Sequence, residues 1–330
     1  MQYDCRMLRP YELTLDLPVS LSSDVPSTTF KVWEVLMASR DGDLERIKKL
    51  TDECPELIYA QYNYTPPIHF AVREGHTHLV AYLLDLGAHD PAYITYPFKD
   101  TLSTVADDRG LGGIVSLLHD YAGRPELCKF KGDNGSIDYG HTAETIEFQR
   151  SIAGHKLDHV TRMLDANPDL ARNELLFWGE GVLARSANDP DFEMLSLLVS
   201  RGASVPKMSK WGRAYYFKHY DIAKYLMDNG MDAAHTTWHN VTLLHDMAQE
   251  GDIDKARLLL DSGAALDVIE EEYQSTPLGL AVRWGNLDMV GFLLERGADP
   301  NRSGAAWSAP LAWAIKKGYT EIQKILEAAI

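Results

Sequence analysis

The sequence predicts an all-α protein in which short helix-turn-helix units stack into a solenoid. Three observations support this class: apolar residues at helical spacing in paired short segments, a glycine at each turn, and recurrence of the pattern at a fixed interval. The clearest unit is residues 275–301, STPLGLAVRWGNLDMVGFLLERGADPN. Neither of its helices is long enough to bury its apolar face alone, so such units are stable only in stacks.

Individual residues indicate where the two helices of this unit begin and end. Thr276 can cap the first helix, and Pro277 suits its first position because a helix does not use the N–H there. Gly285 allows a left-handed turn between the helices, which costs glycine little. The second helix carries apolar residues at helical spacing and ends at Gly297.

The unit recurs along the chain. Leu244, Leu278 and Leu311 occupy matching positions about 33 to 34 residues apart. Clear copies occupy residues 66–90, 242–267 and 309–329, and weaker ones lie within 33–50, 101–123, 147–164, 182–203 and 209–230. We count about nine units, of which the first, fourth, fifth and sixth are degenerate.

This pattern resembles the ankyrin-repeat family over about residues 30–330. The expected organisation has four parts. Residues 1–29 form an N-terminal extended or disordered segment, 30–123 a front block of about three repeats, 124–143 an inserted loop, and 144–330 a rear block of about six repeats. The last unit carries several lysines and is expected to be a polar-faced C-terminal cap.

Two segments break the pattern, and each has two interpretations. Residues 1–29 are a disordered tail or an extended segment folded against the first repeat, and the alternating leucines of 13–17 favour the second. Residues 124–143 are a solvated spacer or a loop on the binding face. The turn formers Gly132-Asp133-Asn134-Gly135 suit either interpretation.

Composition narrows the function. The chain has 32 Lys+Arg against 48 Asp+Glu, a formal charge of −16, which disfavours nucleic acids and anionic membranes as partners. No signal peptide or membrane-spanning stretch is evident. The three cysteines, Cys5, Cys54 and Cys128, are widely spaced, as expected in a reducing cytoplasm. We therefore expect a cytoplasmic monomer without a cofactor or metal.

The resemblance implies a concave surface made of loop tips and of the last positions of each inner helix. Aromatic residues and arginines gather at these positions, a composition typical of interface hot spots. The predicted contact residues are Arg73, Glu74, Arg109, Trp178, Tyr216, Phe217, Trp238, His239, Tyr273, Arg283, Trp284 and Trp307. The alternative is that aromatic residues fill core volume in degenerate units, as expected of Trp178, Trp211 and Tyr215, and that single arginines are solvated charges.

No known catalytic motif is present, and the sequence identifies no catalytic, cofactor-binding or metal-binding residues. The absence of a motif does not exclude a catalytic site, because function resides in sites and not in folds. One set of residues is the best candidate for acid–base chemistry. It comprises Arg213, Tyr216, Asp232, His235 and His239.

The favoured function is therefore non-catalytic binding of a protein or an extended peptide in an aromatic-lined concave groove. The rival is a small-molecule-binding protein or enzyme whose pocket is formed by the degenerate central repeats and the 124–143 insertion. A deep pocket would favour the rival and an open aromatic stripe the interaction module. A third hypothesis, a spacer that masks a partner's surface, cannot be separated from the first by sequence.

Overall fold

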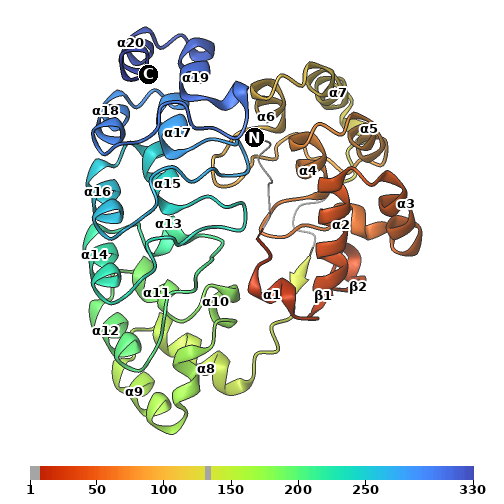
Figure 1. The fold of residues 1–330 in the computed structure, drawn as a ribbon. Coiled ribbons are helices and arrows are strands. Elements are labelled where there is room, and N and C mark those ends of the chain that lie inside the picture. Colours follow the sequence, from red (N-terminus) through yellow and green to blue (C-terminus); the bar gives the residue numbers. More distant parts are fainter. Residues whose placement is uncertain (1–7, 131–134) are drawn as a thin grey trace. The chain divides into compact units, whose positions relative to one another are not determined.

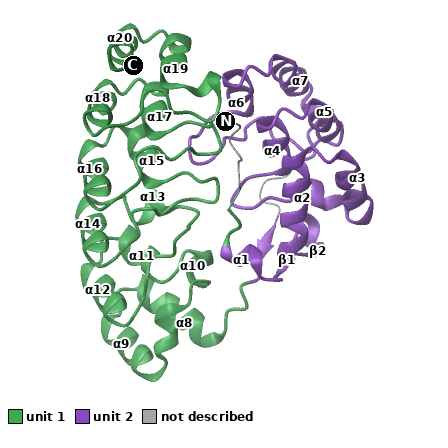
Figure 2. Ribbon diagram, viewed as in Figure 1, with its two compact units in different colours: residues 1–10, 139–330 green, residues 11–138 purple. Residues whose placement is uncertain are grey.

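The computed structural model describes residues 8–130 and 135–330 of the chain (Figure 1). These residues form two compact units, which Figure 2 shows in different colours. Unit 2 comprises residues 11–138, and unit 1 comprises residues 139–330 together with residues 1–10. Cys5 and most of the predicted Gly132-Asp133-Asn134-Gly135 turn lie outside the described residues.

Unit 1 is a stack of helix pairs, which confirms the predicted fold class. Its inner helices form one row and its outer helices another (Figure 1). The pairs are α8 (Ala143–Ala153) with α9 (Leu157–Ala166), α11 (Leu183–Asn188) with α12 (Phe192–Ser200), α13 (Gly212–Tyr215) with α14 (Tyr220–Asp228), α15 (Leu243–Glu250) with α16 (Ile253–Asp261), α17 (Pro277–Arg283) with α18 (Leu287–Glu295), and α19 (Pro310–Lys317) with α20 (Thr320–Ala329). The short elements η4 (Pro168–Arg172), α10 (Leu176–Gly179) and η5 (Ala306–Ser308) lie between them.

The pair α17 and α18 forms for the reasons seen in its sequence. The Thr276 side chain accepts a hydrogen bond from the backbone N–H of Gly279 at 3.2 Å, and Pro277 is the first helical residue. Gly285 has φ 74°, the left-handed conformation that its turn requires. Leu278 and Val290 are fully buried, so the stack is held by apolar packing between successive pairs.

Polar side chains also join successive repeats. The Asn286 side-chain amide donates hydrogen bonds to the carbonyls of Ala248 and Gln249, both at 2.8 Å, at the end of α15. The last carbonyls of a helix have no partner within it, so a donor from the next repeat satisfies them. The same device recurs at His219, whose Nε2 lies 3.2 Å from the carbonyl of Asn188 at the end of α11.

Unit 2 contains three further helix pairs among its described residues. They are α2 (Thr29–Asp41) with α3 (Leu44–Glu53), α4 (Pro67–Arg73) with α5 (Thr77–Asp85), and α6 (Leu102–Asp108) with α7 (Gly112–Ala122). The 3-10 helices η2 (Pro55–Tyr59) and η3 (Pro125–Leu127) follow α3 and α7. Here His76 Nε2 lies 2.7 Å from the carbonyl of Arg40, again joining one repeat to the end of the previous inner helix.

A small sheet completes unit 2, and the sequence did not predict it. The described part of the N-terminal segment forms α1 (Tyr11–Thr14), β1 (Pro18–Ser20), η1 (Ser22–Asp24) and β2 (Pro26–Thr28). A third strand, β3 (Ser136–Ile137), comes from the predicted insertion, and the antiparallel order is β2-β1-β3. Val19 is paired with both neighbouring strands and buried, and Leu13 is fully buried. These strands are too short to be recognised from alternation alone.

No helix among the described residues is both long enough and apolar enough to span a bilayer.

Candidate partner-binding surface

Four of the predicted contact residues lie together in the last repeats of unit 1. Tyr273 precedes α17, Arg283 ends it, Trp284 follows it, and Trp307 lies in η5. With Trp313 of α19 they form what we call the aromatic cluster, which comprises Tyr273, Arg283, Trp284, Trp307 and Trp313. The repeat register brings loop and inner-helix residues of two successive units to one place.

Arg283 is the centre of the aromatic cluster. Its guanidinium carbon lies 3.9 Å from the ring centroid of Tyr273 and 4.1 Å from that of Trp284. The Trp313 ring is 5.6 Å away, and the Arg283 side chain is almost completely buried. A guanidinium held against aromatic rings gains cation–π attraction, which offsets part of the cost of removing it from water, and that cost is lower for a guanidinium than for an ammonium group. Trp284 is only half-buried, so one ring of the stack remains at the surface.

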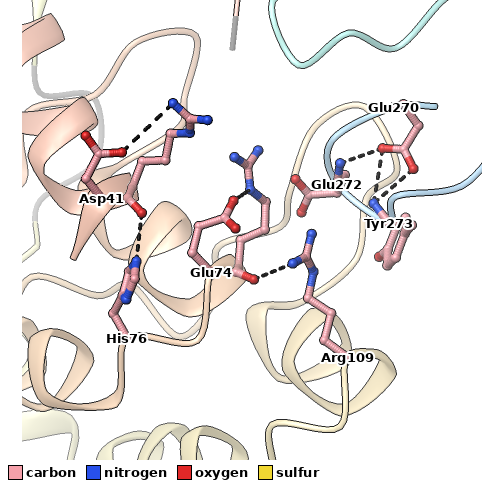
Figure 3. Close-up of polar contacts among 9 residues, drawn as sticks. Asp41, Glu74, His76, Arg109, Glu270, Glu272 and Tyr273 are labelled. Carbon is pink, nitrogen blue, oxygen red and sulfur yellow. Dashed lines mark hydrogen bonds and ion pairs between the residues drawn. The ribbon is translucent and has the colours of Figure 1, made fainter. Parts of the chain in front are cut away.

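The loop that carries Tyr273 is fixed by a buried carboxylate. Glu270 accepts hydrogen bonds from the backbone N–H groups of Glu272 at 2.5 Å and Tyr273 at 2.9 Å (Figure 3). It also accepts one from the backbone N–H of Ser275 at 3.1 Å. Burial raises the pKa of Glu270 to about 8, against the effect of these donors, which favour the charged form. Ser275 Oγ in turn accepts a 2.9 Å hydrogen bond from the Trp313 indole. The loop is therefore held before any partner arrives.

Trp178 lies elsewhere in unit 1 and is the most exposed of the predicted contacts. Its side chain is 68% exposed, so the expectation that Trp178 fills core volume is wrong, and its φ of 59° is left-handed. The Trp178 carbonyl accepts hydrogen bonds from Lys210 Nζ at 2.5 Å and from the Tyr139 hydroxyl at 3.0 Å. The Tyr139 ring also stacks on His141. A left-handed tryptophan persists only when its surroundings hold it, and these contacts do so.

The three predicted contacts in unit 2 form a chain of polar interactions at the ends of inner helices. Arg73 Nε donates to the Glu74 carboxylate at 2.7 Å, and Arg109 Nη1 donates to the Arg73 carbonyl at 2.6 Å (Figure 3). Burial by itself would raise the pKa of Glu74, but the charges of Arg73 and Arg109 hold that pKa below its ordinary value. Glu74 is therefore a carboxylate held between cations.

The remaining predicted contacts are buried, as are Arg73, Tyr273 and Arg283. Tyr216 and Phe217 are fully buried, and Trp238 and His239 are each 1% exposed. The Tyr216 hydroxyl donates to the Glu180 carbonyl at 2.6 Å, and burial raises the pKa of Tyr216 well above 10. Helix α13 is only four residues long, so large rings fill volume there that a longer helix would occupy. These four side chains cannot contact a partner without rearrangement.

Among the residues considered for acid–base chemistry, Tyr216 and His235 are in edge-to-face contact, with ring centroids 5.8 Å apart, and each of the others described below has its own partner. His235 Nε2 is 2.8 Å from the Ser209 hydroxyl, and burial lowers the pKa of His235 to about 4, so the ring is neutral. Asp232 accepts a 2.8 Å hydrogen bond from a backbone N–H in its own turn. Arg213 lies 3.2 Å from the Glu250 carboxylate and 3.9 Å from that of Asp246.

Sequence reasoning missed several residues at these sites. Trp313 occupies the same repeat position as the core residue Leu280, which predicts burial rather than a place in the aromatic cluster. Lys317 has its Nζ 5.7 Å from the Trp313 ring centroid. The repeat register could have indicated Lys317, because it occupies one of the last positions of an inner helix. The hydrogen bond from Lys210 to the Trp178 carbonyl could not be predicted from the repeat pattern of the sequence.

Comparison with known proteins agrees with this geometry. Residues 211–304 match a model of ankyrin repeats in three copies, and residues 64–96 match a model of a single ankyrin repeat. The chain is 34% identical over 105 residues to the palmitoyltransferase ZDHHC17 of Rattus norvegicus, which covers 31% of this chain and 17% of that protein. It is 35% identical over 88 residues to the palmitoyltransferase ZDHHC13 of Homo sapiens, covering 27% of this chain and 14% of that protein.

The fold and these matches define a repeat protein built from stacked helix pairs. The chain is an ankyrin-repeat protein, as the sequence predicted. The part that it shares with the two palmitoyltransferases is their ankyrin-repeat region, and the chain spans less than a fifth of either relative's length.

Proposed function

We propose that the chain binds a segment of a partner protein, or an extended peptide, on the surface formed by the aromatic cluster. Ankyrin repeats generally mediate protein–protein interaction. The observation that supports the finer proposal is the packing of Arg283 against the rings of Tyr273 and the half-buried Trp284. Trp313, which also lies near Arg283, contacts the half-buried Trp307. Tryptophan is among the residues most enriched at interface hot spots, and Trp284 and Trp307 are the partly exposed members of the cluster, while the buried Tyr273 and Arg283 support them from below.

The rigidity of the aromatic cluster supports this role. The loop of Tyr273 is held by the Glu270 carboxylate, and Trp313 is held by its hydrogen bond to Ser275. A surface that is ordered before binding loses little conformational entropy when a partner arrives. The half-buried rings of Trp284 and Trp307 supply the apolar contact area, because they remain at the surface.

The test begins with selection of peptides from a displayed library on the immobilised chain, followed by fluorescence anisotropy of one selected peptide. We expect Trp284→Ala to weaken its binding by about 30-fold, the equivalent of a hot spot worth about 2 kcal/mol. Trp307→Ala should weaken binding in the same direction. The matched control is Phe192→Ala, which removes an aromatic ring that is 42% exposed on the outer helix α12.

Circular dichroism of each variant establishes that the helices remain folded. The proposal is contradicted if Trp284→Ala and Phe192→Ala bind the peptide equally well while both stay folded. Trp178→Ala, tested on the same peptide, measures how far along unit 1 the contact extends.

A further inference from the structure

The inner helices of the last two repeats carry cations, whereas their outer helices carry most of the carboxylates. Helices α17 and α19 contain Arg283, Lys316 and Lys317 and no acidic residue. Helices α18 and α20 contain two acidic residues each, and α20 one lysine. The preceding inner helix, α15, has the opposite character, because it contains Asp246 and Glu250 and neither lysine nor arginine. The row of inner helices therefore becomes cationic where the aromatic cluster lies.

Lys317 is the cation of this group that lies at the surface beside the aromatic cluster. Its Nζ is 5.7 Å from the ring centroid of Trp313, and its side chain is half-buried. Arg283 is almost completely buried, so its charge acts on a partner only at a distance. Lys317 occupies the repeat position equivalent to Trp284, since a glycine follows each of them. Equivalent positions of successive repeats lie on the same side of the stack.

We propose that the segment bound by the aromatic cluster is acidic, with an aspartate or glutamate carboxylate at Lys317 and an apolar side chain against Trp284. This inference rests on the proposed function and names the class of peptide that the cluster binds. The chain as a whole carries a formal charge of −16, so most of its surface repels an acidic segment. The cations of α17 and α19 make this place an exception, and complementary charge sets where and in which register a partner binds.

The repeat spacing determines how far apart the two contacts lie. Trp284 and Lys317 are one repeat apart, and their helices α17 and α19 pack against each other. The axes of packed helices are about 8 to 10 Å apart. An extended chain advances about 3.3 Å per residue, so it covers this distance in about three residues. We therefore expect the apolar and the acidic residue of the bound segment to be about three positions apart.

Selection from a displayed library of random peptides on the immobilised full chain tests the proposal. Peptides that also bind the Trp284→Ala variant are removed, so that those remaining depend on the aromatic cluster. We expect the remaining peptides to contain more Asp and Glu than Lys and Arg, with an acidic residue about three positions from an apolar one. If no peptide remains, the proposed function fails and this inference fails with it. If peptides remain without an excess of acidic residues, only this inference is overturned.

A charge exchange, followed by fluorescence anisotropy of one selected acidic peptide, tests the contact with Lys317. Lys317→Glu should weaken binding about 10-fold, and replacing the acidic residue of the peptide by lysine should restore binding to this variant. The matched control is Lys324→Glu, which makes the same charge change in the same repeat but on the outer helix α20, and it should bind the acidic peptide as wild type does.

Circular dichroism of both variants establishes that their helices remain folded. Lys317→Gln, which removes the charge without reversing it, is the second variant and should weaken binding in the same direction as Lys317→Glu. Equal affinities of the folded Lys317→Glu and Lys324→Glu variants for the acidic peptide would overturn the inference. So would failure of the lysine-containing peptide to recover binding to the Lys317→Glu variant.

Discussion

At the scale of single residues, the repeats hold some buried ionisable groups near neutrality and pair others with opposite charges or aromatic rings. His235 and His245 are buried, which lowers the pKa of each to about 4, whereas burial raises the pKa of Asp246 to about 7. This pKa leaves a large share of Asp246 protonated near neutral pH even though Arg213 lies 3.9 Å away and opposes the shift. Each such group makes stability depend on pH, in a direction set by the sign of its shift.

Asp246→Asn should become more favourable relative to wild type as pH rises from about 4 to about 7. The folded pKa of Asp246, about 7, exceeds the unfolded value, so its stabilising effect is complete below the unfolded pKa and is lost as pH rises through 7. Asparagine has no proton to lose. The measurement is the difference in thermal midpoint between the two proteins across this range, in which the unchanged histidines cancel. A difference in thermal midpoint that stays constant with pH would contradict the raised pKa of Asp246.

The predicted contact residues show what sequence can and cannot locate at this scale. The position of Trp284 before a turn glycine predicted its place at the end of an inner helix, because repeat register determines which face a residue occupies. The same reasoning placed Tyr216 and Phe217 equivalently, but their helix α13 is too short to keep the regular geometry. Repeat register predicts which face a side chain occupies only where the repeat is regular. In a degenerate repeat the face depends on the three-dimensional packing.

At the scale of elements, successive repeats are joined by side chains that complete the hydrogen bonding of inner helices. Asn286 is the clearest example, since its amide donates to two carbonyls at the end of α15. Sequence predicted the helix pairs, together with the cap and the turn of residues 275–301, because these depend on nearby residues. It did not predict the sheet of β1, β2 and β3, because the partners of β1 include a strand from the far end of unit 2.

Asn286→Ala should lower the free energy of unfolding by about 1 to 2 kcal/mol, because two hydrogen bonds are lost and the freed carbonyls are only partly hydrated. Urea denaturation followed by circular dichroism measures this. Asn301→Ala, at an exposed asparagine in the loop after α18, is the control and should change stability by less than about 0.5 kcal/mol. Equal effects of the two substitutions would show that the Asn286 contact contributes nothing.

At the scale of the whole molecule, stability is distributed along the stack instead of residing in one central core. Each helix pair of unit 1 packs mainly against its neighbours, as α15, α17 and α19 do in succession. In such an array the total stability is approximately a sum of repeat and neighbour terms. A large part of the chain can therefore fold by itself.

A protein consisting of residues 139–330 should retain the helical circular dichroism signal of unit 1 and unfold cooperatively, because most of its packing is between adjacent repeats. Thermal denaturation checks this. Introducing Asn286→Ala into residues 139–330 should lower the midpoint, as in the full chain. A fragment without helical signal would show that unit 1 requires the rest of the chain.

The pairing of β1 with β3 has a consequence for the order of biosynthesis. Pro18 and its neighbours leave the ribosome early, but Ser136 and Ile137, which complete the sheet, follow only after all three helix pairs of unit 2. Chains fold during synthesis roughly from their N-terminus. One edge of β1 therefore stays unpaired while the helix pairs of unit 2 form. The pairing of β3 with that edge is the last step in the folding of unit 2.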